Sequence, residues 1–417
     1  MTLPERDRRV CWHPYTQHAT APEPLPVVGA RGAWLELAGG ARLFDAISSW
    51  WCCLHGHGHP RLVDALARQA ARLDHVLFAG CTHEPAVALA EELVRHAPPG
   101  LSRVFYSDDG STAVEVALKA AFLSWKRRGA GGRTLFLALE GGYHGDTFGA
   151  MALGDPDPFF AECAPLLCRV ERAPPTLDGL AALMRRHGRE AAALLVEPLV
   201  QGAAGMRALP RGLLRAAREL CDETGALLIV DEVMTGFGRT GTLFACEQEQ
   251  VTPDLLCLAK GLTGGMLPLA ATLAREAIFE AFLDRDPARA FFHGHTFTAN
   301  PLACAVALAS LRLALEGEVP ARFAAIGARI EEGIAPLRTR GMVRRVGGIV
   351  AVELADEAGG YLSPLGARLR AACRSAAPEV LLRPLGNVLY AMPPACATDE
   401  ECDLVAAAMR RVVDSLA

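Results

Sequence analysis

The chain contains almost no lysine. Of its 42 basic residues only three are lysines, Lys119, Lys126 and Lys260, so arginine serves nearly everywhere that a surface cation is needed. A position that keeps lysine against this bias is a candidate for an amine that must lose its proton, which a guanidinium does not do. Lys126 lies in a basic run and Lys119 on the polar side of a helical pattern. Lys260 ends the apolar run DLLCLAK and precedes GLTGG, a setting that suits a nucleophilic amine as well as a structural residue.

Other absences narrow the class of protein. The net charge is −5 and no basic stripe is interleaved with aromatic residues, which argues against nucleic-acid binding. The longest apolar stretch, PLACAVALASL, is shorter than the ~18 residues that span a membrane. The first fifteen residues lack the apolar segment of a secretory signal. The thirteen cysteines are scattered without a CxxC pair, so we expect reduced thiols in a cytoplasmic protein.

Short apolar runs that alternate with amphipathic spans predict an α/β fold. The runs are nearly all apolar, as expected for strands of a sheet that is covered on both faces. The amphipathic span at 211–225 has the pattern of a crossover helix, which favours a mostly parallel sheet. The predicted strands are 134–140, 192–198, 226–232, 255–260 and 268–274.

The length of the chain and a change of pattern near residue 306 indicate more than one domain, because single cores rarely exceed ~250–300 residues. After residue 306 two helical stretches are followed by shorter strand-like segments. We predict an N-terminal arm at 1–54 that joins the small domain, a large α/β domain at 55–305, and a small α+β domain at 306–417.

Reactive side chains collect where the predicted strands end. Asp231 follows one apolar run, Lys260 follows the next, and Tyr143 lies in a glycine-flanked turn after a third. Ligands of open parallel sheets bind beyond these carboxyl ends. A turn with Gly110 and Ser111 leads into an alanine-rich helix, whose first amides, with that of the following threonine, suit a phosphate.

Pyridoxal phosphate requires this set of groups. A lysine holds its aldehyde, a carboxylate keeps its ring nitrogen protonated, an aromatic ring stacks on it, and backbone amides bind its phosphate. Each group alone has an ordinary explanation as well: Asp231 as a turn cap, Tyr143 as a packing residue, and Gly110 with Ser111 as a helix N-cap. Their conjunction favours the cofactor site.

A nicotinamide-dependent oxidoreductase is the alternative from another enzyme class. Residues 236–241, GFGRTG, match GxGxxG, and Asp254 lies 18 residues beyond Gly236. In the dinucleotide motif, however, glycine follows the strand directly, a helix begins within the motif, and the acid ends the next strand. Here the strand ends in two acids, the following residues form a poor helix, and Asp254 precedes a strand. The context therefore argues against this function.

The run HGHGHP raises the question of a metal site. It offers His55, His57 and His59 on a turn that is rich in glycine. We expect no carboxylate or cysteine to complete a ligand set, so no metal is predicted.

Six segments resemble, in sequence and in order, those of the class III, fold-type I pyridoxal-phosphate aminotransferases. They are DDGSTAVEVALKAA, GGYHGDTFGAM, VEPLVQGAAGM, LLIVDEVMTGFGRTG, LAKGLTGGMLPLAATL and HGHTFTANPLACAVAL. The resemblance covers nearly all of the chain. It implies that Lys260 carries the cofactor covalently and that Asp231 pairs with its pyridinium. It also implies that Tyr143 stacks on the ring and that Gly110 and Ser111 bind the phosphate.

The same resemblance implies a homodimer with shared active sites. In this family a threonine of the second subunit reaches the phosphate, and Thr296 occupies that position in HGHTF. Gly294, in the same segment, is expected on the substrate side. A non-catalytic, cofactor-binding scaffold is the least favoured alternative, because every expected catalytic position is filled.

The ends of the chain resemble those of the biotin-pathway branch of the family. WHPYTQ provides Tyr15, ISSWWCCLHGHGHP provides Trp50 and Trp51, and LLRPLGNVLYAMPP provides Arg383. A long keto acid needs apolar walls, and its distant carboxylate needs a guanidinium. As alternatives, the tryptophans are core residues and Arg383 forms a surface ion pair.

This second resemblance implies transfer of an amino group to 8-amino-7-oxononanoate, which gives 7,8-diaminononanoate, with S-adenosylmethionine as the donor. Met234 stands where many relatives have glutamine, which is compatible with that branch. His295 precedes the phosphate threonine where many S-adenosylmethionine-dependent members have proline. Lysine therefore stays open as the donor. A general ω-aminotransferase that uses ornithine, GABA or β-alanine also stays open.

Overall fold

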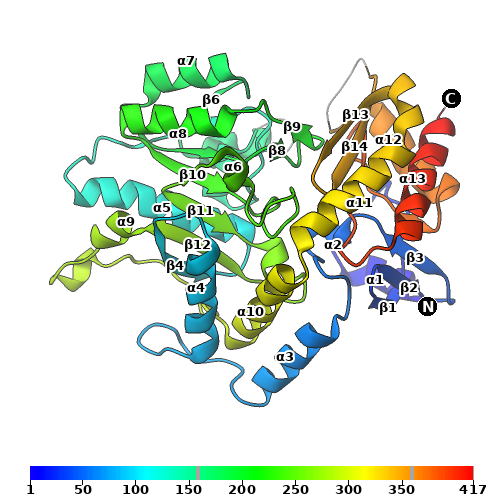
Figure 1. Cartoon of the computed structure of the whole chain (residues 1–417), viewed down its shortest axis with the longest axis horizontal. Coiled ribbons are helices and arrows are strands. Elements are labelled where there is room, and N and C mark those ends of the chain that lie inside the picture. The colour runs from blue at the N-terminus through cyan, green and yellow to red at the C-terminus, as the bar shows by residue number, and fades with distance from the viewer. Residues whose placement is uncertain (156–159, 357–360, 417) are drawn as a thin grey trace.

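A seven-stranded sheet forms the centre of the larger part of the molecule (Figure 1). The computed structural model describes residues 1–155, 160–356 and 361–416. Six strands are parallel to one another, and β12 is antiparallel to both of its neighbours. In spatial order the strands are β4 (Leu101–Ser107), β12 (Ala270–Arg275), β11 (Leu255–Leu258), β10 (Leu227–Asp231), β7 (Ala191–Val196), β5 (Leu135–Leu139) and β6 (Val170–Ala173).

The apolar composition of these strands follows from their burial on both faces. In β10, Leu228 and Val230 pack into one core cluster, while Leu227 and Ile229 pack into another on the opposite face. The alternation arises because successive side chains of a strand point to opposite faces. All five strands predicted from the sequence are present, and so is the mostly parallel α/β sheet.

Helices cover both faces of this sheet. On one face α5 (Gly110–Arg127) packs across β4, β7, β10, β11 and β12. The remaining elements of this part are α3 (Pro60–Ala70), α4 (Glu84–His96), α6 (Phe148–Leu153), α7 (Leu177–His187), α8 (Leu213–Thr224), α9 (Glu276–Glu280), β8 (Val200–Gln201) and β9 (Arg207–Ala208).

The smaller part of the molecule joins the two ends of the chain. Strands β1 (Val27–Arg31), β2 (Trp34–Leu37) and β3 (Arg42–Asp45) form a sheet with β15 (Val380–Leu381), which is parallel to β3. Figure 1 shows these N-terminal strands, in blue, beside the C-terminal helices. The N-terminal arm therefore pairs with the C-terminal segment, while the predicted domain boundaries stay a prediction.

A second sheet and several helices complete this part. The sheet has the strand order β13 (Gly341–Val346), β14 (Ile349–Leu354) and β16 (Val388–Ala391). Helix α10 (Pro301–Glu316) packs against α3 and α4 and leads into α11 (Val319–Gly333). The other helices are α1 (Leu3–Val10), α2 (Ser48–Trp51), α12 (Pro364–Ala376) and α13 (Asp399–Asp414).

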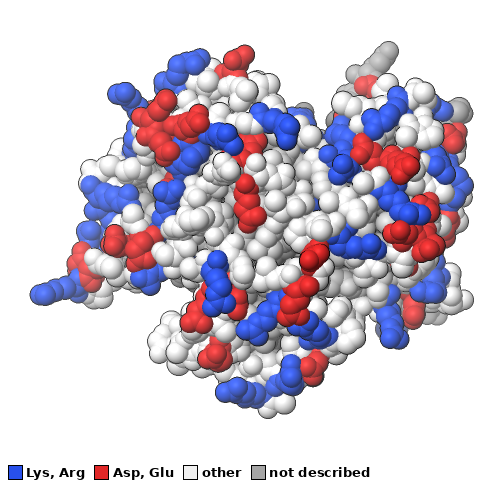
Figure 2. Space-filling model, viewed as in Figure 1, with Lys and Arg blue, Asp and Glu red and all other residues white. Residues whose placement is uncertain are grey.

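The surface carries charges of both signs. In Figure 2 basic and acidic side chains alternate over the visible face, so neither sign dominates there. Among the described residues, no helix combines the length and the apolar character that crossing a membrane requires.

Candidate active site

Lys260 and Asp231 lie at the same edge of the large sheet. Asp231 is the last residue of β10, and its register partner is Cys257 of the neighbouring strand β11. Lys260 lies two residues beyond the end of β11, at the start of a short 3-10 helix. Burial lowers the pKa of the Lys260 amine, while Asp231 and Glu197 act in the opposite direction. An amine with a lowered pKa loses its proton more readily, as a nucleophile must.

A hydrogen bond to His144 orients Asp231. The histidine Nδ1 lies 2.7 Å from Asp231 Oδ2, and both side chains are buried. The other carboxylate oxygen accepts the N–H of Val233 at 3.0 Å. The turn after β5 that carries Tyr143 thus also supplies a side chain that fixes the acid.

Glu197 is a second buried acid at this edge, which the sequence analysis did not select. It directly follows β7 and accepts the N–H groups of Tyr143, at 3.3 Å, and Gly202, at 2.9 Å. Burial raises the pKa of its carboxyl to about 7. Its signal in the sequence is the same as that of Asp231, an acid directly after an apolar run.

The N-terminus of α5 lies next to the end of β10. A Cβ added to Gly110 would lie 2.5 Å from Val233 Cγ1, so glycine permits this close approach. The amide of Thr112 already donates to Asp109 Oδ1 at 2.9 Å. The amides of Gly110 and Ser111 are therefore the leading candidates for a phosphate, since this N-cap bond already engages the amide of Thr112.

Aromatic side chains from two distant segments meet at the site. The hydroxyls of Tyr15 and Tyr143 lie 2.9 Å apart. Tyr15 donates to the carboxylate of Asp146 at 2.6 Å, and Tyr143 donates to it at 3.1 Å. The Tyr143 ring also stacks on Phe160 at 6.1 Å. Asp146 was not selected from the sequence, because its partner Tyr15 lies far away along the chain.

The two tryptophans lie on a left-handed turn. Residues 48 to 51 have φ values of 49°, 44°, 70° and 77°, and none of them is glycine. Such a conformation costs roughly 1–2 kcal/mol for each L-residue. The turn places Trp50 under the Arg383 guanidinium, with Cζ 4.7 Å from the ring centroid, and Trp51 under the Lys260 amine at 5.0 Å. Trp51 Nε1 donates to Tyr390 Oη at 2.9 Å.

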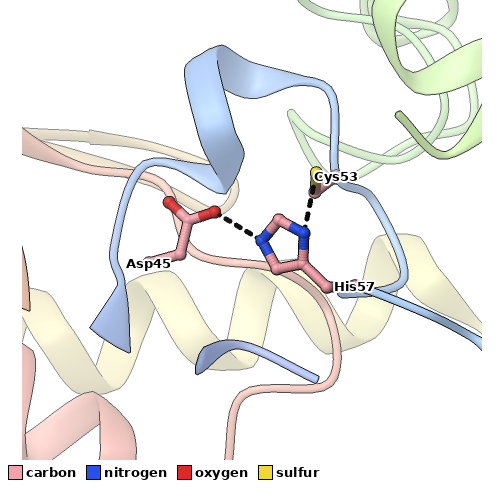
Figure 3. A group of neighbouring side chains, drawn as sticks. All are labelled: Asp45, Cys53 and His57. Atoms are coloured by element: carbon pink, nitrogen blue, oxygen red, sulfur yellow. Dashed lines mark hydrogen bonds and ion pairs between the residues drawn. The ribbon is translucent and has the colours of Figure 1, made fainter. Parts of the chain in front are cut away.

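A carboxylate and a thiol flank His57, contrary to the expectation that neither lies near the histidines. Figure 3 shows Asp45 and Cys53 on opposite sides of the imidazole. Nε2 lies 2.9 Å from Asp45 Oδ2, and Nδ1 lies 3.7 Å from Cys53 Sγ. These three side chains are the candidate metal ligands. One possible ligand atom of each of the three lies within 4.8 Å of the other two.

The GFGRTG segment has structural contacts instead of a phosphate-binding shape. Arg239 is buried, donates to the carbonyl of Pro393 at 2.9 Å, and lies 4.3 Å above the Phe323 ring. Asp254 accepts the amide of Leu228 at 2.7 Å and pairs with Arg218 at 2.8 Å. These contacts do not support the nicotinamide alternative.

Gly294 and Thr296 lie on an exposed loop before α10. Gly294 has a φ of 157°, and both residues are exposed. The structure therefore brings together Lys260, Asp231, Tyr143, Tyr15, the two tryptophans and Arg383, with Gly110 and Ser111 at the adjoining helix. It leaves Gly294 and Thr296 on the surface of the subunit.

The arrangement fits pyridoxal phosphate. An amine with a lowered pKa lies near an oriented carboxylate, which provides groups for the aldehyde and for the ring nitrogen. The N-terminus of α5 provides N–H groups for a phosphate. Only glycine at position 110 allows that helix end to lie against Val233, next to the carboxylate.

Comparisons with known proteins show the family of this chain. The family model for class-III aminotransferases matches residues 15–413. An adenosylmethionine-8-amino-7-oxononanoate aminotransferase of Synechococcus elongatus is 47% identical over 97% of this chain and 98% of its own. The enzyme of that name from Geobacter sulfurreducens is 41% identical over 100% and 98%.

Solved structures show the same architecture. The crystal structure of the enzyme of that name from Methanocaldococcus jannaschii has a TM-score of 0.95 at 35% identity, covering 99% of this chain and 98% of that one. A PLP-bound amine transaminase from an uncultivated Pseudomonas species has a TM-score of 0.91 at 33% identity, covering 98% and 99%. This chain therefore belongs to the class-III aminotransferases, pyridoxal-phosphate enzymes of fold type I.

Proposed function

We propose that this aminotransferase converts 8-amino-7-oxononanoate to 7,8-diaminononanoate in biotin biosynthesis, with S-adenosylmethionine as the amino donor. The observation that carries the proposal is the placement of the two tryptophans. Trp51 lies against the Lys260 amine, and Trp50 lies against the Arg383 guanidinium. The names of the relatives from Synechococcus elongatus and Geobacter sulfurreducens support it.

Pyridoxal phosphate would supply an electron-accepting ring beside the amine-bearing carbon of the substrate. Asp231, held by His144, would keep its ring nitrogen protonated. The amides of Gly110 and Ser111 would hold its phosphate at the start of α5. Tyr143, whose hydroxyl contacts Tyr15 and Asp146, would offer its ring for stacking.

Lys260 acts as the base. Its Nζ would take the proton from the donor's amine-bearing carbon and deliver it to the neighbouring reacting carbon. The lowered pKa of the amine, caused by burial, favours the neutral form that this step needs.

The substrate wall suits a long keto acid. The indole rings provide apolar surface for the methylene chain, and the Arg383 guanidinium pairs with the distant carboxylate. Contact with Trp50 holds that guanidinium over the indole before the substrate arrives. Tyr15 would extend this wall, because its ring makes an edge contact with Trp50 at a centroid distance of 5.7 Å.

The proposal includes a homodimer with Thr296 of the partner subunit at the phosphate and Gly294 on the substrate side. The loop before α10 supports it, because Phe292 and Phe297 are 69% and 59% exposed and thus apolar surface is available for burial in an interface. We also place the enzyme in the cytoplasm, since its thirteen cysteines are free thiols.

One experiment on the holoenzyme tests the function. The purified chain is loaded with pyridoxal phosphate, and formation of 7,8-diaminononanoate is measured with S-adenosylmethionine and with lysine as donor. We expect product with the first donor, and a Lys260→Ala variant that borohydride no longer labels at this peptide. Product with lysine alone would correct the donor, and no diamine with either would refute the substrate.

A general ω-aminotransferase is the second candidate. Two observations favour it: His295 in the phosphate loop, and a TM-score of 0.91 to an (S)-enantioselective omega-transaminase from Thermomicrobium roseum at 30% identity. Turnover of ornithine, GABA or β-alanine without turnover of 8-amino-7-oxononanoate would select this alternative.

A further inference from the structure

The left-handed turn at residues 48–51 needs a group that holds it. Four consecutive residues with positive φ are unfavourable for L-amino acids, and such strain persists only where the surroundings enforce it. The turn also carries Trp50 and Trp51, so whatever enforces its shape determines where both indole rings lie.

Asp45 makes the contacts that enforce the turn. Its side chain is fully buried at the end of β3. Oδ1 accepts the amides of Ser49, at 2.9 Å, and Ile47, at 3.3 Å. Oδ2 accepts the hydroxyl of Ser49 at 2.7 Å and lies 2.9 Å from His57 Nε2. The two oxygens of one carboxylate thus contact the turn itself and the histidine beside it.

His57 extends this clamp to the neighbouring backbone. Its N–H donates to Gly32 O at 2.7 Å, and its carbonyl accepts the Gly32 amide at 3.0 Å, which anchors it to the β1–β2 hairpin. Its other ring nitrogen faces Cys53, two residues after the turn (Figure 3). Asp45 therefore links the turn to β3 and, through His57, to the connection between β1 and β2.

We propose that Asp45 is the positioning residue for the tryptophan wall of the substrate pocket. The carboxylate holds the left-handed turn, and the turn sets the ring of Trp50 between Tyr15 and Arg383. This inference rests on the proposed function, because it assigns Asp45 to binding of the long keto acid. It assigns no part in the chemical step.

The first test separates binding from chemistry. Asp45→Asn keeps the side-chain shape and one acceptor oxygen but turns the oxygen that serves Ser49 Oγ and His57 into a donor. We expect the KM for 8-amino-7-oxononanoate to rise by about 10–100-fold, since misplacement by ~1 Å costs on that scale, with kcat changed less than about threefold. The cofactor absorption band should change little, because Asp231 and its bond to His144 lie outside the turn.

Glu249→Gln is the matched control. Glu249 is also a buried carboxylate with two amide donors, Gly212 at 2.7 Å and Arg215 at 2.9 Å, but it caps α8 instead of the turn. A general effect of losing a buried carboxylate would appear in both variants. A rise in KM confined to Asp45→Asn supports the proposal, and an equal rise in both overturns it.

A double-mutant cycle tests whether Asp45 acts through Trp50. In a Trp50→Ala background, Asp45→Asn is expected to raise KM less than about threefold further, because the group that it positions is already absent. Ser49→Gly removes the side chain at a φ of 44°, where glycine is unstrained. Added to Asp45→Asn, it should bring the raised KM part of the way back to the wild-type value. Independent effects together with no recovery would refute the positioning role.

A readout without cofactor or substrate completes the test. Amide exchange of the peptide 46–53 in the cofactor-free protein should accelerate in Asp45→Asn and stay unchanged in Glu249→Gln. Unchanged exchange in Asp45→Asn would contradict the clamp. Failure of the wild type to use 8-amino-7-oxononanoate would instead refute the proposed function, and the exchange result would still decide on the clamp.

Discussion

Buried carboxylates at neighbouring strand ends give the site a dependence on pH at the scale of single residues. The Glu197 carboxyl has a pKa raised from 4.5 to about 7 by burial. Folding therefore takes up a proton between these pH values. The stabilising effect of this group is fully present below pH 4.5 and is lost as pH rises to about 7.

Glu197→Gln should flatten this pH dependence. The free energy of unfolding of the cofactor-free wild type should fall by about 3 kcal/mol between these pH values because of this group, and the variant should lack that share of the fall. Urea unfolding at both ends of the range measures it. Glu219→Gln is the control, because Glu219 is exposed on α8. If the free energy of unfolding fell equally with pH in Glu197→Gln and the wild type, Glu197 would not be the group responsible.

Asp231→Asn should lower kcat by roughly 10²–10⁴-fold, because a buried cation that loses its partner costs about 3–5 kcal/mol. Pre-steady-state absorbance measurements would locate the loss in proton transfer. A decrease of less than about tenfold, with the cofactor still bound, would show that the acid does not stabilise the ring nitrogen's charge.

At this scale the sequence predicts residues whose role follows from local context. Lys260 and Asp231 each follow an apolar run, so their place at the sheet edge could be predicted. Asp45 and Asp146 could not be selected, because their importance depends on partners that folding brings to them. Asp146, for example, contacts Tyr15, which lies in a different segment.

Among the elements, α5 joins the proposed phosphate site to the sheet. Gly110→Ala would place a Cβ 2.5 Å from Val233 Cγ1 and so push the helix end away from β10. We expect the Kd of pyridoxal phosphate to rise by about 10–100-fold, as for other ~1 Å displacements of binding groups.

Gly132→Ala is the matched control, made in the loop after α5. A Cβ at Gly132 has no neighbour within 4 Å, so this substitution displaces nothing. Titration of cofactor fluorescence compares the two variants with the wild type. Equal affinities in all three would show that the approach of α5 to Val233 is not required for phosphate binding.

Strands with nearly continuous apolar runs were predictable, whereas β4 and β6 were not. Strand β4, LSRVFYS, mixes polar and apolar residues at the sheet edge, and β6 has only four residues, three of them with partly exposed side chains. The left-handed turn at 48–51 was also beyond prediction. Its sequence, SSWW, contains no glycine, so the conformation comes from tertiary contacts such as those of Asp45.

For the whole molecule, the proposed homodimer makes a prediction about mixed subunits. Lys260→Ala and Thr296→Ala homodimers should each be impaired. In a heterodimer of the two variants, one site has an intact Lys260 and the intact Thr296 of the partner subunit. Purified heterodimers should therefore recover about half of the wild-type kcat per dimer.

This complementation distinguishes the two possible positions of the threonine. If Thr296 served the site of its own subunit, every site in the heterodimer would carry one defect and activity would not recover. The heterodimer is isolated with two different affinity tags, and tag-swapped pairs are the control.

At this scale the α/β class could be predicted from the alternation of apolar runs and amphipathic spans. The family could be predicted from the order of the six sequence segments. The pairing of β3 with β15 did not, because nothing local in either short strand indicates a partner at the other end of the chain.

That pairing has a consequence for how the enzyme matures on the ribosome. Strand β3 ends at Asp45, and β15 leads directly to Arg383. The residues proposed to hold the cofactor, like Trp50 and Trp51, all lie before residue 300, whereas Arg383, proposed for the substrate's distant carboxylate, is translated near the end. A nascent chain halted before β15 would contain the proposed cofactor site and both tryptophans, yet would lack the guanidinium proposed to select an acid with a distant carboxylate.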